Sequence, residues 1–267
     1  MKKVGFVTFS LICCGLALAL STPARAELSG TEIIKRYNEM GSVMDMSAEI
    51  EMRIISKSGQ ERVRQLTIVS KRGDDATRKV LLRFLSPADV KGTAFLSISG
   101  VRGEDENWLY LPALGKPRRI ASEERSNSFM GSDFTYADIG LLKIDDYRHT
   151  LLRTERLGNE EVYVVESVPV SDKVRRADGF AKKIWWIRKS TFTLARAEFL
   201  DNNGKVIKVL TGSDVVDLGS GAWLSSRLEM QNLTTGSRTI ITFKNIKVNS
   251  GIPDDYFTTR ELTRTSR

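Results

Sequence analysis

Hydrophobic and polar residues alternate with a period of two along most of the chain. Such alternation is typical of a β-strand that buries one face. The residues on one side of the first such segment are all apolar: Met46, Ala48, Ile50, Met52 and Ile54. Ser58-Gly59 follows as a turn and residues 63–69 form the next alternating segment, so the pattern predicts a β-hairpin.

The same alternation predicts strands through the rest of the chain. These candidate strands are residues 79–85, 94–99, 108–111, 117–121, 147–156, 162–169, 182–188, 194–200, 205–210, 223–232 and 237–248. Short turns that contain Gly204 and Gly236 separate two pairs of them, as tight antiparallel hairpins require. Without a long linker or a repeat of fixed period, we expect a mainly β fold, an incomplete (half-open) antiparallel β barrel of about 11–12 strands.

Two segments are expected to be α-helices that cover this barrel. Ser29 and Glu32 form a capping-box pattern, and apolar residues then follow at helical spacing as far as Gly41. The second segment, residues 132–142, has Ser132 as its expected N-cap. Because a curved sheet has an apolar concave face that must be filled or covered, both helices should lie over that face.

The first 26 residues have the pattern of a cleavable secretory signal. Lys2 and Lys3 precede an apolar run at residues 4–20, and Ala24-Arg25-Ala26 is a small-residue cleavage site. We therefore expect a signal peptide at residues 1–26 and a single domain at residues 27–267. An uncleaved anchor is the alternative, because an apolar run of 17 residues lies at the lower edge of a membrane span.

Composition adds constraints on stability and on partners. The chain is 41% hydrophobic and 28% charged, as is usual for a folded protein. Removal of residues 1–26 would take away both cysteines, Cys13 and Cys14, and lower the net charge from +8 to +5. No disulfide could then stabilise the mature chain, so its stability must come from an ordinary core. A modest positive charge suits an anionic membrane surface or an acidic partner, and nucleic acid is not an expected partner.

Signals for catalysis are poor. The sequence has no nucleophile elbow, P-loop, dinucleotide-binding or zinc-protease motif, so we expect no enzyme activity, no metal and no cofactor. The single histidine, His149, follows Asp145 and Asp146 at the start of a predicted strand. A general base oriented by one of these carboxylates is conceivable, which keeps a hydrolase as a third hypothesis. A histidine at the protein surface is the favoured interpretation.

Two clusters of basic residues are candidates for contacts with anionic head groups or with a partner. The first cluster contains Lys116, Arg118 and Arg119, together with Arg125. The second surrounds a predicted hairpin and contains Lys173, Arg175, Arg176, Lys182, Lys183, Arg188 and Lys189. Each basic residue near an anionic lipid surface contributes about 1 kcal/mol. The alternative is a solvated sheet edge, where lysine discourages pairing with another edge.

Three segments resemble the outer-membrane lipoprotein-sorting protein family, whose members are LolA-like periplasmic proteins. They are G-T-A-F-L at residues 92–96, W-L-Y-L-P through R-R-I at residues 108–120, and S-F-M-G-S-D-F-T-Y at residues 128–136. The resemblance continues to residues 253–257. It implies a LolA/LolB-like half-barrel closed by helices, a periplasmic location, and an internal apolar cavity that holds acyl chains. An inner-membrane transporter as donor and an outer-membrane acceptor are implied partners, and no catalytic residue is implied.

The leading hypothesis is a monomeric, non-enzymatic periplasmic carrier that binds acyl chains of lipoproteins or lipids and moves them toward the outer membrane. The alternative is an accessory binding module of an envelope transporter complex, with a solidly packed barrel and no lipid cargo. The expected cavity lining comes from the apolar strand faces: Met52, Ile54, Leu82, Phe84, Trp108, Tyr110, Trp185, Phe199, Met230 and Phe243. A register error of one residue inverts any of these face assignments.

Overall fold

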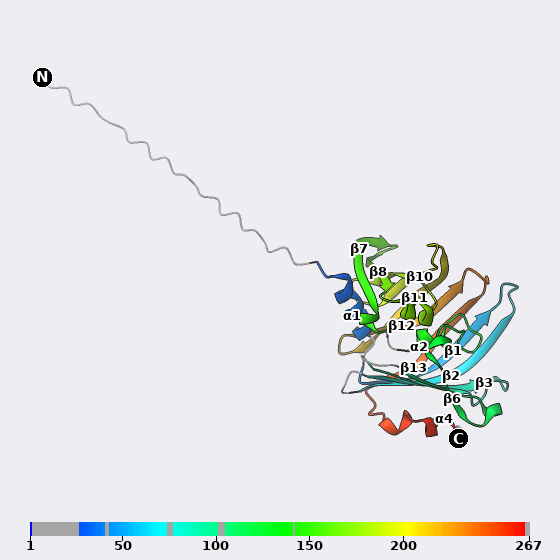
Figure 1. Cartoon of the computed structure of the whole chain (residues 1–267). Coiled ribbons are helices and arrows are strands. Elements are labelled where there is room, and N and C mark those ends of the chain that lie inside the picture. Colours follow the sequence, from blue (N-terminus) through cyan, green and yellow to red (C-terminus); the bar gives the residue numbers. More distant parts are fainter. Residues whose placement is uncertain (2–26, 41–42, 74–76, 101–104, 141, 265–267) are drawn as a thin grey trace.

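Thirteen antiparallel strands form one strongly curved sheet in the computed structural model, which describes residues 1, 27–40, 43–73, 77–100, 105–140 and 142–264 (Figure 1). From one edge to the other the strands are β6 (Pro117–Arg119), β5 (Glu106–Tyr110), β4 (Ala94–Ser99), β3 (Arg78–Ser86), β2 (Glu61–Arg72), β1 (Asp45–Ile55), β13 (Arg238–Val248), β12 (Ala222–Asn232), β11 (Val206–Gly219), β10 (Leu194–Leu200), β9 (Lys182–Arg188), β8 (Glu160–Pro169) and β7 (Tyr147–Leu157). The expected mainly β, half-open antiparallel architecture is confirmed.

The two edge strands, β6 and β7, follow each other in the chain but lie at opposite ends of the sheet. The chain builds the sheet outward from β1 to β6, crosses to the other edge, and returns strand by strand from β7 to β13. There β13 pairs with β1, with Phe243 opposite Ile50. We call residues 120–140 and 142–146 the crossing segment; it contains η2 (Ser122–Glu124), α2 (Tyr136–Ile139) and η3 (Ile144–Asp146).

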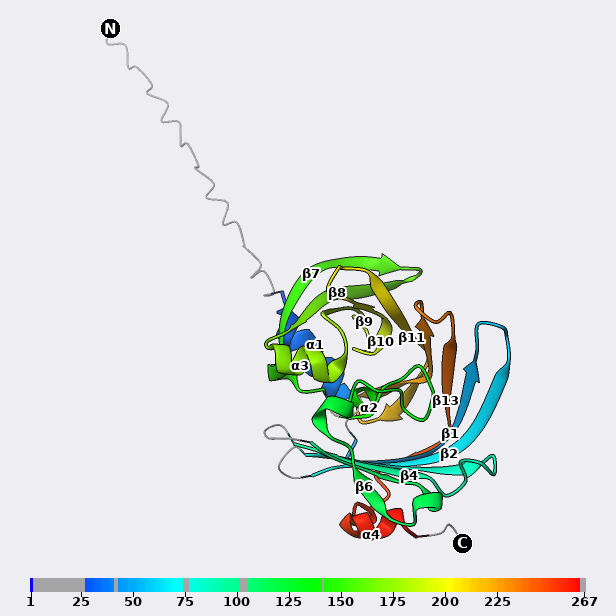
Figure 2. The same cartoon turned by 45° about the vertical axis from the view of Figure 1, so that its right-hand side comes forward.

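Helix α1 (Gly30–Met40) begins as the sequence predicts. The Oγ of Ser29 accepts a hydrogen bond from the backbone N–H of Glu32 at 3.1 Å. Ile33 and Ile34 are fully buried, and α1 packs against β7, β8 and β12. The apolar stripe of this helix therefore covers part of the sheet, on the side where Figure 2 shows α1, α2 and α3 (Asp172–Asp178) enclosed by the curving strands.

The expected helix at residues 132–142 is much shorter in the structure, where α2 spans four residues. Thr135, and not Ser132, is its N-cap, and its Oγ1 accepts a hydrogen bond from the N–H of Asp138 at 3.3 Å. The hydroxyl of Ser132 instead donates to the carbonyl of Phe129 at 2.7 Å. Ser132 thus stabilises a preceding turn, which is why the helix starts later than its sequence pattern indicated.

That turn is built on the Met-Gly pair of the S-F-M-G-S-D-F-T-Y segment. Met130 and Gly131 both have positive φ, 52° and 73°, and the N–H of Ser132 donates to the carbonyl of Phe129 at 3.0 Å. Positive φ at both central residues is the geometry of a type I′ hairpin turn. It brings Phe129 and Phe134 to the inner side of the sheet, where Phe129 packs against Phe95 with ring centroids 5.5 Å apart.

A buried carboxylate ties this turn to the far half of the sheet. Asp133 accepts hydrogen bonds from the hydroxyls of Ser237 at 2.5 Å and Thr239 at 2.7 Å. Its carbonyl oxygen accepts a further hydrogen bond from the Nζ of Lys208 at 2.8 Å. Asp133 therefore holds the crossing segment against β11 and the start of β13.

The outer, convex face of the sheet is also covered near β4 and β5. Helix α4 (Thr259–Leu262) packs against these two strands, on the outside of the sheet in Figure 2. Phe257, after η4 (Asp254–Tyr256), and Leu262 are buried there against Leu81 and Leu96. At β4 and β5 the sheet thus has apolar neighbours on both faces. The turn η1 (Pro112–Leu114) follows β5.

We expect Asp133→Ala to lower the free energy of unfolding by about 2–3 kcal/mol, because two buried hydroxyls lose a charged acceptor. Urea denaturation followed by circular dichroism measures this loss. Asp201→Ala is the matched control, because Asp201 accepts two backbone N–H bonds in the turn after β10. The control should cost about 1 kcal/mol or less, and an equal loss in both variants would contradict the anchoring role of Asp133.

Candidate functional site

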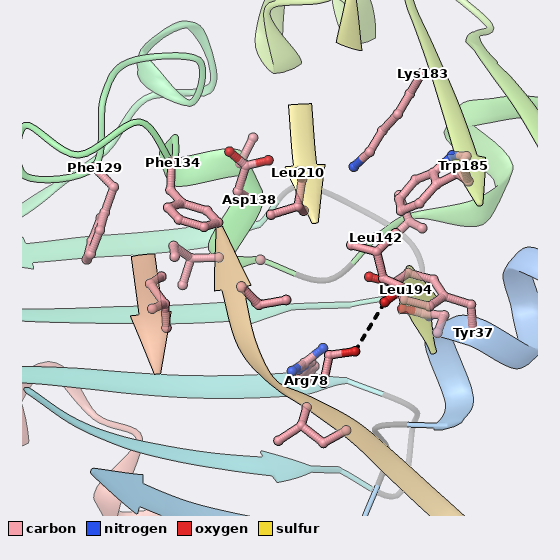
Figure 3. Close-up of a pocket in the computed structure, with 18 of the residues that line it drawn as sticks. Tyr37, Arg78, Phe129, Phe134, Asp138, Leu142, Lys183, Trp185, Leu194 and Leu210 are labelled. Carbon is pink, nitrogen blue, oxygen red and sulfur yellow. Dashed lines mark hydrogen bonds between the residues drawn. The ribbon is translucent and has the colours of Figure 1, made fainter. Parts of the chain in front are cut away.

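A cavity of about 310 Å³ lies between the concave face of the sheet, α1 and the crossing segment. Figure 3 shows Tyr37 of α1, Leu142 of the crossing segment, and Trp185, Leu194 and Leu210 of strands β9 to β11 around it. Most lining side chains are apolar, and they come from both halves of the sheet. A volume of this size lies at the lower end of the range for small-molecule sites.

Four of the ten side chains expected to line a cavity do line it: Met52, Leu82, Trp185 and Phe243. They come from β1, β3, β9 and β13. Four others are buried in the same apolar core but lie outside the cavity lining: Ile54, Phe84, Phe199 and Met230. These eight residues share the concave side of the sheet, so the alternating pattern assigned their faces consistently.

Trp108 and Tyr110 lie on the opposite face. Both pack in the outer cluster with Phe257 and Leu262 under α4, whereas Leu109 between them points to the inner core. The apolar pattern of β5 predicts both side chains in the cavity, but the structure places them in the outer cluster instead. The alternation along β5 could not identify the inner face, because α4 covers the outer face and apolar residues suit both.

Three residues of the first basic cluster lie outside the cavity lining, whereas its fourth, Arg125, is part of the lining. Lys116, Arg118 and Arg119 are exposed, and the last two belong to the edge strand β6. The guanidinium of Arg118 pairs with the Glu124 carboxylate at 3.0 Å. Such a surface pair contributes little, about 0–1 kcal/mol.

The second basic cluster does not form one surface. Lys182 is on the outer face, paired with Glu166 at 2.6 Å. Arg188 is buried and donates to the carbonyl of Gly212 at 2.9 Å and to the Glu160 carboxylate at 2.8 Å. Lys183 is also buried, and it lines the cavity. Part of the segment expected as a hairpin turn is helix α3, which carries Lys173, Arg175 and Arg176.

His149 is buried, not exposed as the sequence analysis favoured. Its Nδ1 lies 2.6 Å from the Oγ of Ser167, and its Nε2 lies 3.1 Å from the carbonyl oxygen of Ile144. The Nε1–H of Trp185 donates to the same Ser167 Oγ at 2.8 Å. Burial lowers the pKa of His149. Ser167 therefore links His149 to Trp185, and this contact orients the Trp185 ring at the cavity wall.

An ion-pair network occupies one side of the cavity. Arg125 of the crossing segment lies 3.2 Å from Asp105 and 3.5 Å from Asp178, and Lys143 lies 3.0 Å from Asp105. The hydroxyl of Tyr147 donates to Asp178. Burial raises the pKa of Asp178, and the nearby Arg125 guanidinium opposes that rise. These contacts join the crossing segment to α3 and to the residue before β5.

Lys183 points into the cavity without an acidic partner. Its Nζ lies 3.7 Å from the centroid of the Trp185 ring and 4.3 Å from that of Phe199. Among the described residues it forms no ion pair and no side-chain hydrogen bond. Burial lowers the pKa of this lysine from 10.5 to about 8, and the charges of Asp138 and Asp178 partly oppose the shift.

A second basic group, Arg78 at the start of β3, lines another part of the cavity (Figure 3). Burial lowers the pKa of Arg78, and Tyr37 opposes this change. Burial likewise raises the pKa of Tyr37. The cavity thus combines a large apolar lining with charged groups of both signs, of which Lys183 and Arg78 form no ion pair with a described residue.

Neither Lys183 nor Arg78 was identified from the sequence as a cavity residue. For Lys183 a signal existed, because residues two apart on a strand share a face and Trp185 was expected to line the cavity. The position of Lys183 in a basic cluster suggested a solvated surface instead. No such signal exists for Arg78, whose place in the lining beside Tyr37 of α1 depends on tertiary packing.

Comparisons with known proteins agree with this architecture. A family model described as an uncharacterized protein matches residues 76–264, more than half of the chain. A domain from Vibrio parahaemolyticus, described as an outer membrane lipoprotein-sorting protein domain, is 30% identical. Its alignment covers 88% of this chain and 98% of that chain, with a TM-score of 0.82. A search of the curated proteins finds no match.

Two further solved structures are similar. A DUF1329 family protein from Desulfovibrio piger is 29% identical over 87% of this chain and 97% of its own, with a TM-score of 0.81. A LolA superfamily protein from Nitrosomonas europaea is 21% identical over 87% of this chain and 98% of its own, with a TM-score of 0.68, and supports the fold alone.

The half-open sheet, its covering helices and its enclosed apolar cavity define a LolA-like fold. The chain belongs to the DUF1329 family. It is also similar in sequence to the outer-membrane lipoprotein-sorting protein domain described above. No helix in the described part of the chain has the length and apolar character needed to cross a bilayer.

We expect Lys183→Met to raise the free energy of unfolding at pH 7 by about 3 kcal/mol, since each unit of pKa depression costs 1.36 kcal/mol of charged-state stability. Because the folded-state pKa of about 8 lies below the ordinary 10.5, the wild type becomes more stable as pH rises through this window. The advantage of the variant should therefore shrink between these two values. Urea denaturation of both proteins across this pH range measures it.

Lys182→Met is the matched control, because Lys182 precedes Lys183 on β9 and its side chain is 40% exposed. A surface ion pair contributes about 0–1 kcal/mol, so its removal should have little effect. Equal stability of the wild type and Lys183→Met at every pH would show that the buried charge carries no cost.

Proposed function

We propose that this protein is a non-enzymatic periplasmic carrier that binds acyl chains of lipoproteins or lipids and moves them toward the outer membrane. The observation that carries the proposal is the apolar cavity of about 310 Å³ on the concave side of the sheet. Membership of the lipoprotein-sorting family supports the same function. The expected signal peptide at residues 1–26, which would direct export, lies largely outside the described residues.

The size of the cavity is compatible with an acyl chain. About 15 Å³ of such space accommodates one water molecule, so the cavity has room for about 20 groups of that size. Burying one CH₂ group contributes about 0.8 kcal/mol, and a 16-carbon chain with about 15 such groups would gain about 12 kcal/mol when fully enclosed. A carrier must supply most of this free energy of burial, because the acyl chain would otherwise be exposed to water during transfer.

Release requires that the cavity can open. The crossing segment closes one side of it, and its anchors include polar contacts such as the hydrogen bonds of Asp133 and the ion pairs of Arg125. Polar contacts can exchange with water, at a net cost of about 1.5–3 kcal/mol for a hydrogen bond to a charged group. Displacement of this segment by an acceptor would expose the chain without any covalent step.

The partner contacts are also part of the proposal. Lys116 and Arg119 are exposed beside the crossing segment, at the edge of the sheet. They would contact anionic head groups or an acidic surface of a donor in the inner membrane or an acceptor in the outer membrane. We propose that the carrier acts as a monomer.

The alternative function is an accessory binding module with no lipid cargo. That function predicts an interior filled by the protein's own side chains, with room for only a few water molecules. The volume of the cavity favours the carrier, because empty apolar space lowers stability and is retained only where a ligand fills it.

A cavity-filling variant tests the carrier. Leu142→Trp adds bulk at the position that lies centrally in Figure 3, and it should weaken binding of dodecanol by about 10-fold or more. The reason is that excluding two CH₂ groups already costs about 1.6 kcal/mol. Displacement of an environment-sensitive fluorescent acyl probe measures the affinity.

Leu152→Trp is the matched control, because Leu152 is 45% exposed on β7 and lies outside the cavity lining. Its affinity for dodecanol should equal that of the wild type. Native mass spectrometry of the purified mature protein should also detect co-purified lipid. Failure of the wild type to bind either the alcohol or the acyl probe would refute the carrier function.

A further inference from the structure

We propose that Lys183 is the anchor for an anionic head group, so that the cargo is an amphiphile bound with a carboxylate or phosphate inside the cavity. This inference rests on the proposed function, because it specifies the chemistry of the ligand in the same cavity. A neutral lipid head, such as the glycerol ester of a lipoprotein anchor, would accept a hydrogen bond from this lysine but would leave its charge uncompensated.

The position of the ammonium is the first support. Lys183 is 9% exposed, and its side chain is directed from β9 toward the middle of the cavity in Figure 3. Its Nζ lies over the Trp185 and Phe199 rings at 3.7 and 4.3 Å. Cation–π contact with two aromatic faces holds the charge at the wall of the cavity and keeps it from reaching bulk water.

The contrast with the other lysine and arginine side chains of the cavity is the second support. Arg125 and Lys143 are neutralised by Asp105 at 3.2 and 3.0 Å. Lys183 and Arg78 have no such partner among the described residues. Among the described residues, Lys183 and Arg78 thus lack an ion-pair partner, as do the cavity carboxylates of Asp138 and Asp146, and the Lys183 ammonium can still pair with an anion of the ligand.

The neighbouring carboxylates do not form an ion pair with the Lys183 ammonium. Asp138 of α2 is engaged by Thr135, whose N–H and hydroxyl donate to it at 2.8 and 2.9 Å. Asp178 of α3 is held by the Tyr147 hydroxyl and by Arg125. Asp146 of η3 also lines the cavity and forms no ion pair with a described residue. None of the three lies within ion-pair distance of Lys183 in the described structure.

The cost of a buried, unpaired ammonium is the third support. Such a group destabilises the folded chain. Buried charged groups without a partner are therefore concentrated at functional sites. An anion beside it would restore a charge-assisted hydrogen bond in a region of low dielectric constant, where that contact is strong. The hydrocarbon tail would then follow the apolar lining from Trp185 toward Leu82 and Met52.

Laurate and dodecanol provide the test, because they share one chain and differ in the charge of the head group. The wild type should bind laurate about 10- to 100-fold more tightly than dodecanol at pH 7. Lys183→Met should lose this preference, so that the ratio of its two affinities falls to about one. Lys182→Met, with the same substitution on the outer face of the same strand, should bind both ligands like the wild type.

A pH titration of the wild type gives an independent measurement that needs no variant. The affinity for laurate should fall by up to about 10-fold per pH unit once the pH exceeds the Lys183 pKa of about 8, while that for dodecanol stays constant. Of the groups that face Lys183, Asp138 and Asp178 carry the charges that oppose the fall of its pKa, and Tyr147, whose pKa burial raises, stays neutral above that value. Arg78, elsewhere in the lining, remains a cation.

The outcomes separate the two proposals. Equal binding of laurate and dodecanol by the wild type, or an unchanged preference in Lys183→Met, refutes the anionic anchor and leaves the carrier function standing. Failure of the wild type to bind either ligand refutes both. Dodecyl phosphate distinguishes the source of the anion: tighter binding than laurate assigns a phosphate head, and weaker binding assigns a carboxylate.

Discussion

The central constraint on this molecule is that its curved sheet does not close on itself. Strands β6 and β7 are consecutive in the chain but form opposite edges, and the crossing segment spans the opening between them. A closed barrel would satisfy both edges with hydrogen bonds and leave its interior fixed. Here one wall is made of side chains and short helical turns, which can be displaced without unpairing a strand.

The crossing segment and the strands play different physical roles. The strands supply a continuous apolar surface that stays in place through backbone hydrogen bonds. The crossing segment supplies Phe129 and Phe134 to the interior, and it is tied down by Asp133 and Arg125 through polar contacts. The crossing segment is therefore held both by apolar burial and by polar contacts.

The alternation of apolar and polar residues predicts the strands well, and it predicts less well which face of each strand points to the cavity. The alternation predicted every strand segment of the sheet, and it assigned Met52, Leu82, Trp185 and Phe243 to the side that has the cavity. It failed for Trp108 and Tyr110, because α4 makes the outer face of β5 apolar too. It also missed Lys183, since a lysine among other basic residues suggests a solvated surface even where its spacing from Trp185 places it inside.

The order of polar and apolar residues by itself determined the local structure: strands, turns and the capped first helix depend on contacts between residues close in the chain. The half-open barrel also followed from that order together with the resemblance to a known family. Only the tertiary structure decided which face is concave, where α2 starts, and that Lys183 and Arg78 lie in the cavity. These features depend on contacts between segments that are distant in the chain, such as β1 with β13 and Asp133 with Thr239. A pattern of period two is identical for both faces of a strand, and only the packing of the other segments distinguishes them.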